Sequence, residues 1–208
     1  MSLSASEVHA LKVAPAVEGV LPAMLKRWSP RSFDAKRAVS DTDLDRIFEA
    51  ARWSASAYNE QPWRFLVGTR NSATHKKILS SLISFNQAWA GTAPVLILGV
   101  ARTRFSHNET PNRVGLYDLG AASSYLTLQA AALGLSTHQM AGFDESIALQ
   151  ALEIPEGYVC GAVIALGYQG EPAALPNEQM IAQETAPRVR KPLNEIVFSA
   201  WETPADLG

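Results

Sequence analysis

The sequence predicts an α+β fold in which helices surround a central sheet. Three observations favour it. Segments with helical and with strand-like patterns alternate irregularly along the chain, which is typical of α+β proteins rather than of repeats or βα units. Three apolar runs, residues 63–68, 95–100 and 158–168, read as strands. The 208 residues, 47% of them hydrophobic, are enough for one domain with a substantial core. We therefore expect a single domain spanning 1–208.

Apolar spacing defines the elements of the first half. A short helix is predicted over 17–28. Ser40, with Asp43 three residues later, is a candidate capping box for a second helix. Its apolar positions keep helical spacing at Leu44, Ile47, Phe48, Ala51 and Ala55. A turn-rich stretch at 54–62 then leads into the strand at 63–68.

The second half alternates again between the two kinds of pattern. The expected elements, in order, are helical pieces at 72–83 and 86–91, a fully apolar strand at 95–100, an exposed, mobile loop at 101–115, a long buried helix at 117–133, a short helix at 146–152, a strand at 158–168, a polar, proline-rich stretch at 170–192 and a strand-like segment at 195–198. Gly134 is expected to end the long helix in the usual C-cap role, and Pro155 to end the short one.

Composition excludes several classes of protein. A formal net charge of −2 argues against a general nucleic-acid binder. The single cysteine, Cys160, rules out an internal disulfide and a cysteine metal cage, and it is expected to be an inert core residue. The four histidines lack metal-ligand spacing, so no metal site is predicted, and His138 is interpreted as a structural histidine. No Rossmann or Walker phosphate motif is present. With neither a signal peptide nor a membrane span, the expected location is the cytoplasm.

Arginine gathers at two distant places in this slightly acidic chain. The first is Lys26-Arg27-Trp28-Ser29-Pro30-Arg31, and the second is Arg188-Val189-Arg190-Lys191. Guanidinium groups bind phosphate in a bidentate manner, so both clusters are candidate phosphate sites. The alternative is a solvated loop for the first and a charged tail for the second.

A third segment, Ser54–Trp63, places hydroxyls, a phenol and amides in one loop between a helix and a strand. Amide side chains can recognise the donor and acceptor edge of a heterocycle. The alternative is a polar turn in which Trp63 and Phe65 fill the core. We expect both: aromatics buried, with Asn59 and Gln61 directed outward. Together the three segments indicate a phosphorylated, ring-bearing ligand.

The order of these motifs resembles that of the nitroreductase family of FMN-dependent oxidoreductases. The resemblance covers about residues 20–198 and rests on these strings: Arg27-x-Ser29-x-Arg31 followed by Phe33, Ser56-x-x-Asn59-x-Gln61-Pro62-Trp63, Ala93-Pro94-Val95, Asp118-Leu119-Gly120, Leu133-Gly134-Leu135, Gly142-Phe143-Asp144, Leu166-Gly167-Tyr168 and the Arg188-x-Arg190-Lys191-Pro192-Leu193 tail. Ala55 and Ala141 depart from residues common in the family, which leaves the substrate open.

The resemblance implies a mainly antiparallel sheet surrounded by helices, in an intertwined homodimer with FMN at the subunit interface. Arg27 and Ser29, with Arg188 and Arg190, would hold the phosphate and ribityl chain. Arg31 would lie near the flavin pyrimidine and support the reduced, anionic flavin. The remaining positions implied to touch the cofactor are Trp28, Ala55, Ser56, Tyr58, Asn59, Gln61, Asn86, Ala141 and Gly142. Of these, the residues of the 54–61 loop would come from the partner subunit.

The implied activity is ping-pong hydride transfer from a transient NAD(P)H, through flavin N5, to a small-molecule acceptor such as a nitroaromatic, quinone or enone. No protein side chain would be a catalytic acid or base, because the cofactor performs the chemistry. Two alternatives stay open: an FMN-dependent dehydrogenase or other redox enzyme acting on a specific small metabolite, and a non-catalytic flavin-binding protein.

Overall fold

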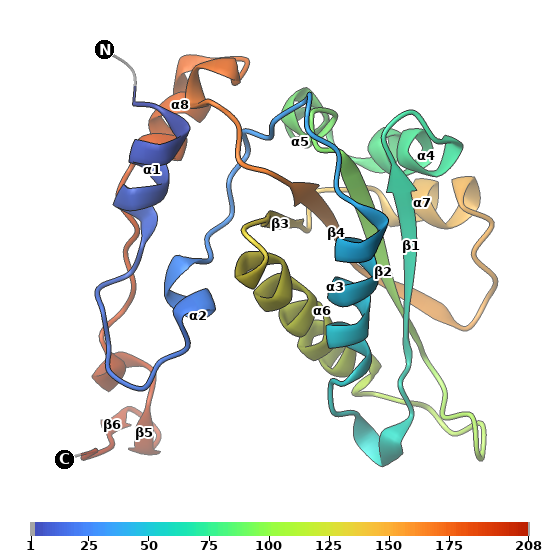
Figure 1. Ribbon diagram of the computed structural model, residues 1–208. Helices are drawn as coiled ribbons and strands as arrows, with labels where there is room; N and C mark the ends of the chain where they lie inside the picture. The colour runs from blue at the N-terminus through green and yellow to red at the C-terminus, as the bar shows by residue number, and fades with distance from the viewer. Residues whose placement is uncertain (1–2, 208) are drawn as a thin grey trace.

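A four-stranded antiparallel sheet forms the centre of the computed structural model, which describes residues 3–207 (Figure 1). The strand order is β1-β2-β4-β3, with every neighbouring pair antiparallel. The strands are β1 (Trp63–Thr69), β2 (Val95–Arg102), β3 (Ser136–Met140) and β4 (Tyr158–Gly167). This confirms the predicted α+β class with a mainly antiparallel central sheet.

Helices cover both faces of this sheet. They are α1 (Ala5–Lys12), α2 (Pro22–Lys26), α3 (Asp41–Arg52), α4 (Ala73–Ser81), α5 (Ser84–Ala90), α6 (Gly115–Ala132), α7 (Glu145–Ala151) and α8 (Glu178–Thr185). One core cluster joins α4, α5, α7 and α8 to one face of the sheet, and a second joins α3 and α6 to the other. Strand β2 lies between them and is buried over seven of its eight residues, because both of its faces carry helices.

Two helix ends follow the expected capping chemistry. The Ser40 side chain accepts a hydrogen bond from the Asp43 backbone N–H at 3.1 Å and begins α3. The reciprocal half of the capping box is absent, because the Asp43 carboxylate instead accepts from the Ser40 hydroxyl at 2.8 Å. Gly134, with φ of +76°, follows the end of α6 in the left-handed conformation that glycine adopts without steric cost.

Three sequence predictions need correction. The helix expected over 17–28 begins only at Pro22 and ends at Lys26, because Gly19 adopts φ of +79° in a preceding turn. Ala55 lies beyond the end of α3 at Arg52. The strand expected at 195–198 is a 3₁₀ turn, Leu193–Glu195, followed by a small hairpin of β5 (Phe198–Ala200) and β6 (Thr203–Pro204).

Three elements were not predicted at all: α1, β3 and α8. Helices α1 and α8 lie side by side at one edge of the molecule (Figure 1). Strand β3 is an edge strand of the main sheet. These elements surround the first arginine segment, so the site depends on parts of the chain that the pattern of apolar residues did not reveal.

The interior agrees with the expectation for the single cysteine. Cys160 is buried in β4, and burial, followed by the nearby Glu145 carboxylate, raises the pKa of its thiol to about 12, as expected for an unreactive core cysteine. Within residues 3–207, no helix is both long enough and apolar enough to cross a membrane.

Candidate functional site

The first arginine segment crosses the edge of the sheet at β3. The Pro30 carbonyl contacts Nδ1 of His138 on β3 at 3.0 Å, and the His138 ring lies 4.7 Å from the Trp89 ring. Burial, opposed only in part by this hydrogen bond and reinforced by Arg31 and Arg27, lowers the pKa of His138 to about 4. The imidazole is therefore neutral near pH 7, with Nδ1–H donating to Pro30. It is a structural histidine that fixes the segment to β3.

Arg27, Arg188 and Arg190 form a basic cluster from opposite ends of the chain. The pKa of Arg27 is lowered first by burial and then by the charges of Arg188 and Arg190. Arg27 donates to the Ser29 hydroxyl at 3.1 Å. Among the ion pairs of residues 3–207, none places a carboxylate oxygen within 4.0 Å of these three arginines. Mutually repelling cations without a counter-anion favour binding of a multiply charged anion such as a phosphate.

Arg188 also has an architectural contact. One of its terminal nitrogens donates to the backbone carbonyls of Lys12 at 2.6 Å and Leu25 at 3.0 Å. It thereby joins the end of α1 and the end of α2 to the C-terminal segment. Arg190, by contrast, donates to the adjacent Val189 carbonyl at 2.8 Å. The cluster is held from behind by backbone carbonyls, which leaves other guanidinium nitrogens for a ligand.

Arg31 belongs to a second group, beyond the end of β3. Its guanidinium carbon lies 5.7 Å from the Phe85 ring, and its Nε is buried without a hydrogen-bond partner in the described chain. Asn86, which follows Phe85 in the chain, is buried and donates from Nδ2 to the Gly142 carbonyl at 2.9 Å. The structure therefore brings together Arg31, Asn86 and the Ala141–Gly142 backbone, three separate parts of the predicted site.

Close packing at Gly142 explains why a glycine stands there. A Cβ atom added at this position would lie 2.6 Å from Asn86 Nδ2 and 2.8 Å from Ile83 Cδ1. The Ile83 backbone N–H also donates to the Gly142 carbonyl at 3.1 Å. A side chain at this position would push α5 away from the loop after β3 and displace Asn86.

Trp28 is placed differently from its neighbours. It is buried at 7% exposure, and the Lys12 ammonium lies 4.7 Å from its ring centroid. The indole therefore packs against α1, and its Nε1 has no hydrogen-bond partner in the described chain. Its side chain supports the arginine segment.

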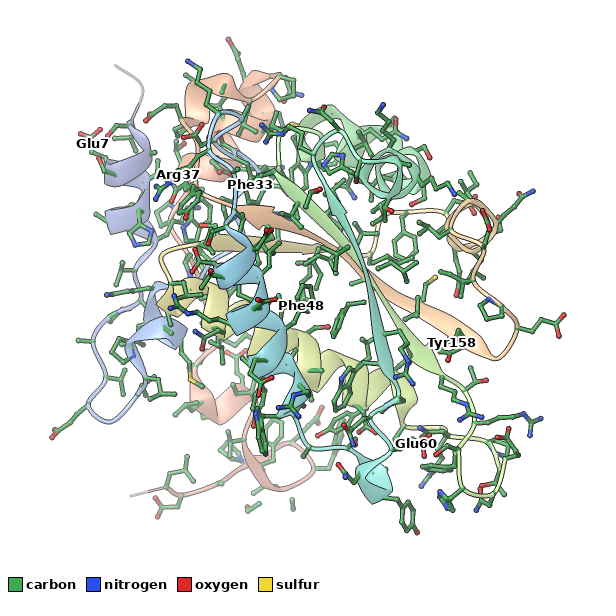
Figure 2. All side chains as sticks on the ribbon, turned by 45° about the vertical axis from the view of Figure 1, so that its right-hand side comes forward. Glu7, Phe33, Arg37, Phe48, Glu60 and Tyr158 are labelled. Carbon is green, nitrogen blue, oxygen red and sulfur yellow. The ribbon has the colours of Figure 1, made fainter. Side chains whose placement is uncertain are left out.

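The amide loop lies far from both arginine groups within one chain. It contains a 3₁₀ turn, Ala57–Asn59, at the far end of the 12-residue α3, which at 1.5 Å per residue is about 18 Å long. Figure 2 shows this separation, with Phe33 after the arginine segment and Glu60 in the loop at opposite ends of α3. Ala55, Tyr58 and Asn59 are exposed, and Ser56 and Gln61 are half-buried.

The amide loop is held in a strained, well-anchored shape. Tyr58, Asn59 and Gln61 have φ of 53°, 53° and 49°, which is unfavourable for residues with a side chain. The Gln61 N–H donates to the Ser56 hydroxyl at 3.0 Å, and the Ala57 N–H donates to the Asp118 carboxylate at 3.1 Å. These bonds present Tyr58, which is 84% exposed, on the surface of the molecule.

One stripe of α6 connects the amide loop to the arginine side. A cavity of about 450 Å³ lies between the loop and the N-terminal half of α6 and is lined by Ser54, Ala55, Ser56, Ala57, Val114, Tyr117, Asp118, Ala121 and Tyr125. A second cavity, of about 320 Å³, lies toward the other end of the helix and is lined by Met24, Arg27, Ser124, Thr127, Leu128 and Gln139. Positions 117, 121, 124, 125 and 128 share one face of a helix. Both hollows therefore open on the same side of α6.

Sequence reasoning missed two charged residues that organise the site, Lys12 and Glu184. Both are buried, and they lie on α1 and α8. Helix signals do exist for these elements: Ser4 with Glu7 forms a full capping box, and Asn177 caps α8 by accepting from the Met180 N–H at 2.9 Å. The contacts that Lys12 and Glu184 make with residues some 150 to 170 positions away carry no local signal.

The fold and the site define a class of α+β proteins in which helices cover an antiparallel sheet and arginines gather near its β3 edge. The chain belongs to the nitroreductase family, whose family model matches residues 24–88 and 83–168. This confirms the resemblance inferred from the motif order.

Individual relatives agree with the family assignment. A solved oxidoreductase containing FMN is similar, with 32% identity and a TM-score of 0.82 over 90% of this chain and 95% of that one. A Desulfovibrio desulfuricans protein solved in complex with FMN has 26% identity and a TM-score of 0.68, covering 89% of this chain and 98% of its own. An Archaeoglobus fulgidus protein, provisionally named NADH dehydrogenase/NAD(P)H nitroreductase, is 30% identical over 73% of this chain and 86% of its own length.

Proposed function

We propose that this protein is an FMN-dependent NAD(P)H oxidoreductase that acts as a homodimer on small organic electron acceptors. The observation that carries the proposal is the set of unneutralised arginines. Arg27, Arg188 and Arg190 lack a counter-anion in the described chain, and Arg31 carries a buried Nε without a partner there and lies over Phe85, the residue before Asn86. FMN has a phosphate for the first group and a polar ring edge for the second.

The residues present fit FMN in chemistry and in order. Arg27, Ser29, Arg188 and Arg190 would hold the phosphate and ribityl chain through charge-assisted hydrogen bonds. Arg31 and Asn86 would meet the pyrimidine edge, and the Ala141–Gly142 backbone would pass the ring. Bound FMN would supply the redox chemistry, taking hydride from NAD(P)H at N5 and, after the nicotinamide leaves, passing it to a nitroaromatic, quinone or enone.

The protein's own contribution is orientation and charge. Arg31 would place a fixed positive charge where electron density would build up on the ring, and its half-buried position would strengthen that interaction. His138 holds the Arg27–Arg31 segment on β3 through Pro30. No side chain is assigned a proton-transfer role.

A dimer accounts for the separation of the amide loop from the arginines. The two cavities on α6 are centred about seven residues apart along the helix, roughly 11 Å at 1.5 Å per residue. If two copies pack this face of α6 against each other about a two-fold axis, the amide loop of one chain approaches the Arg27 side of the other. Ser56, Tyr58, Asn59 and Gln61 would then complete the cofactor site from the partner subunit.

Exposed apolar side chains support such an interface. On α6, Leu116, Tyr117 and Tyr125 are 47%, 79% and 47% exposed, an unusual surface for a helix whose opposite face is core. The C-terminal segment adds Trp201 at 87% and Val189 at 80% exposed. Its strands β5 and β6 pair with each other and lie apart from the main sheet (Figure 1). Both surfaces fit burial against a second copy.

Purification and turnover test the proposal. The protein should be isolated yellow, or take up added FMN, and should have a light-scattering mass of two chains. It should oxidise NADH or NADPH faster when menadione or a nitrofuran is added. A colourless protein that fails to take up FMN would refute the cofactor assignment, and a mass of one chain would refute the shared site. A flavin that binds but is reduced by neither nicotinamide would indicate a flavin-binding protein instead of an oxidoreductase.

A further inference from the structure

Glu184, on α8, is a buried carboxylate aimed at the backbone of the arginine segment. The residue is 1% exposed. Its two oxygens accept from the Arg31 backbone N–H at 3.1 and 2.9 Å, and one of them also accepts from the Ser32 N–H at 3.1 Å. A carboxylate is rarely fully buried unless it is paired, so these hydrogen bonds define its role in the fold.

Helix α1 holds Glu184 in place from behind. The Lys12 ammonium, 5% exposed, donates to the Gln183 and Ala186 carbonyls at the C-terminal end of α8. The charged groups that influence Glu184 are Arg31 and Lys12. Residues 12 and 184 both lie outside 24–168, the part of the chain that the family model matches. The clamp on Arg31, formed by Glu184 with Lys12 behind it, is therefore built by segments outside the part of the chain that the family model matches.

The clamp holds the Arg31 backbone and leaves its side chain available. The Arg31 guanidinium forms no ion pair with Glu184 in the described chain. It lies over the Phe85 ring instead, and its Nε has no hydrogen-bond partner there. Ser32 is fixed further, because its hydroxyl donates to the Glu171 carbonyl at 2.6 Å and its own carbonyl accepts from the Gly170 N–H at 2.9 Å. The Ser32 backbone and hydroxyl are thus held by hydrogen bonds, while the Arg31 guanidinium lies near Phe85 with its Nε without a partner in the described chain.

We propose that Glu184 is a positioning residue that fixes the Arg31–Ser32 backbone so that the Arg31 guanidinium meets the flavin ring. This inference rests on the proposed function, since the flavin is the group that Arg31 would meet. A purely structural carboxylate would stabilise the fold without acting through Arg31.

A double-mutant cycle separates the two roles. Glu184→Gln keeps the size of the side chain but removes its negative charge and replaces one of the two acceptor oxygens by an N–H₂ donor, which cannot accept from a backbone N–H. It should slow reduction of bound FMN by NADH about tenfold, as expected for losing one hydrogen bond to a charged group. In an Arg31→Ala background the same substitution should change the rate less than twofold. Glu178→Gln, an exposed glutamate on the same helix, is the matched control and should have less than a twofold effect in both backgrounds.

A second readout does not depend on activity. In protein stripped of FMN, hydrogen exchange of the Arg31 and Ser32 amides should be faster in Glu184→Gln than in the wild type and in Glu178→Gln, because the amide side chain has one acceptor oxygen in place of two and carries no negative charge. If Glu184→Gln does not fold, Glu184→Asp replaces it, since it keeps the charge but is one methylene too short to reach both amides.

Two results would overturn the inference while leaving the proposed function intact: an equal slowing by Glu184→Gln with and without Arg31, or unchanged exchange of the two amides. Wild-type protein that takes up no FMN is a different failure, because it refutes the proposed function and with it the flavin-facing role of the clamp.

Discussion

Arg31 and Arg188 differ in what the structure leaves free on each guanidinium. Arg188 belongs to the phosphate-type cluster and also bonds the Lys12 and Leu25 carbonyls, whereas Arg31 lies over Phe85 with an unpartnered Nε. Arg188→Ala should therefore weaken FMN binding about 10- to 100-fold, the value of a charge-assisted contact, with a smaller effect on the reduction rate. Arg31→Ala should do the reverse and slow reduction about 10- to 100-fold.

Equilibrium titration with FMN and stopped-flow reduction at saturating FMN measure the two quantities separately. Lys191→Ala is a suitable control, because this neighbouring cation is not assigned a contact. Equal effects of the two arginine substitutions on binding and on reduction would contradict the division of labour.

His138 gives the protein a specific dependence of stability on pH. Its pKa is about 4 in the folded protein and about 6.5 in an unfolded chain, so the unfolded state binds the proton first as the pH falls. The free energy of unfolding should lose about 2 kcal/mol through this group between pH 7 and about pH 5, and nothing from it above pH 7.

His138→Asn isolates that contribution, because the amide can still donate to the Pro30 carbonyl but does not titrate. Urea unfolding at the two pH values should show a smaller loss of stability in the variant than in the wild type. Buried Glu184, whose pKa is raised mainly by burial, acts in the opposite direction but is common to both proteins. If the wild type and His138→Asn lose the same stability between the two pH values, a group other than His138 is responsible for the loss.

At the scale of elements, α3 separates the arginine segment from the amide loop, and its start depends on Ser40. Ser40→Ala removes the acceptor for the Asp43 N–H and should lower the free energy of unfolding by about 1 kcal/mol, or the Tm by about 2–4 °C for a chain of this size. Thr42→Ala, two residues into the helix and exposed, should have a much smaller effect. Thermal unfolding followed by circular dichroism provides the measurement. An equal fall in Tm for Ser40→Ala and Thr42→Ala would contradict the capping role of Ser40.

Which elements could be predicted follows from how each is stabilised. Strands β2 and β4 are apolar because helices cover both faces of the sheet, and α6 is apolar along most of its length. These three elements could therefore be predicted from their apolar residues. Strand β3 was missed because Ser136-Thr137-His138-Gln139-Met140 is largely polar, as an edge strand can be. Helix α8 was missed because Pro172, Pro176 and Pro187 surround it and its capping residue was overlooked.

The candidate site divides in the same way. Motif order along the chain was enough to name Arg27, Arg31, Asn86 and Gly142, and the structure brings the last three together. The bonds from Glu184 to Arg31 and from His138 to Pro30 join residues more than a hundred positions apart. Such pairings depend on the tertiary fold, and a single sequence has no periodicity or spacing that specifies them.

At the scale of the whole molecule, the proposed dimer would leave neither chain with a complete site alone. In a two-fold dimer, each site would take its arginines from one subunit and its amide loop from the other. One chain carrying Arg27→Ala with Arg188→Ala, and a second carrying Asn59→Asp, should therefore each form inactive homodimers. Aspartate suits position 59 because it tolerates the positive φ found there while replacing the amide with a repelling charge.

Mixing the two defective chains then tests the shared site directly. Unfolded together and refolded at equal amounts, they should form about half mixed dimers, and each mixed dimer has one site with both arginines and an intact loop. About one quarter of wild-type FMN-binding capacity and activity should return. Each chain refolded alone is the control for recovery during refolding. If the mixture has only the mean FMN binding and activity of the two defective chains refolded alone, the arginines and the amide loop do not act in one site across the interface. Recovery near one quarter of the wild-type values, by contrast, requires that residues of both subunits contact the same flavin.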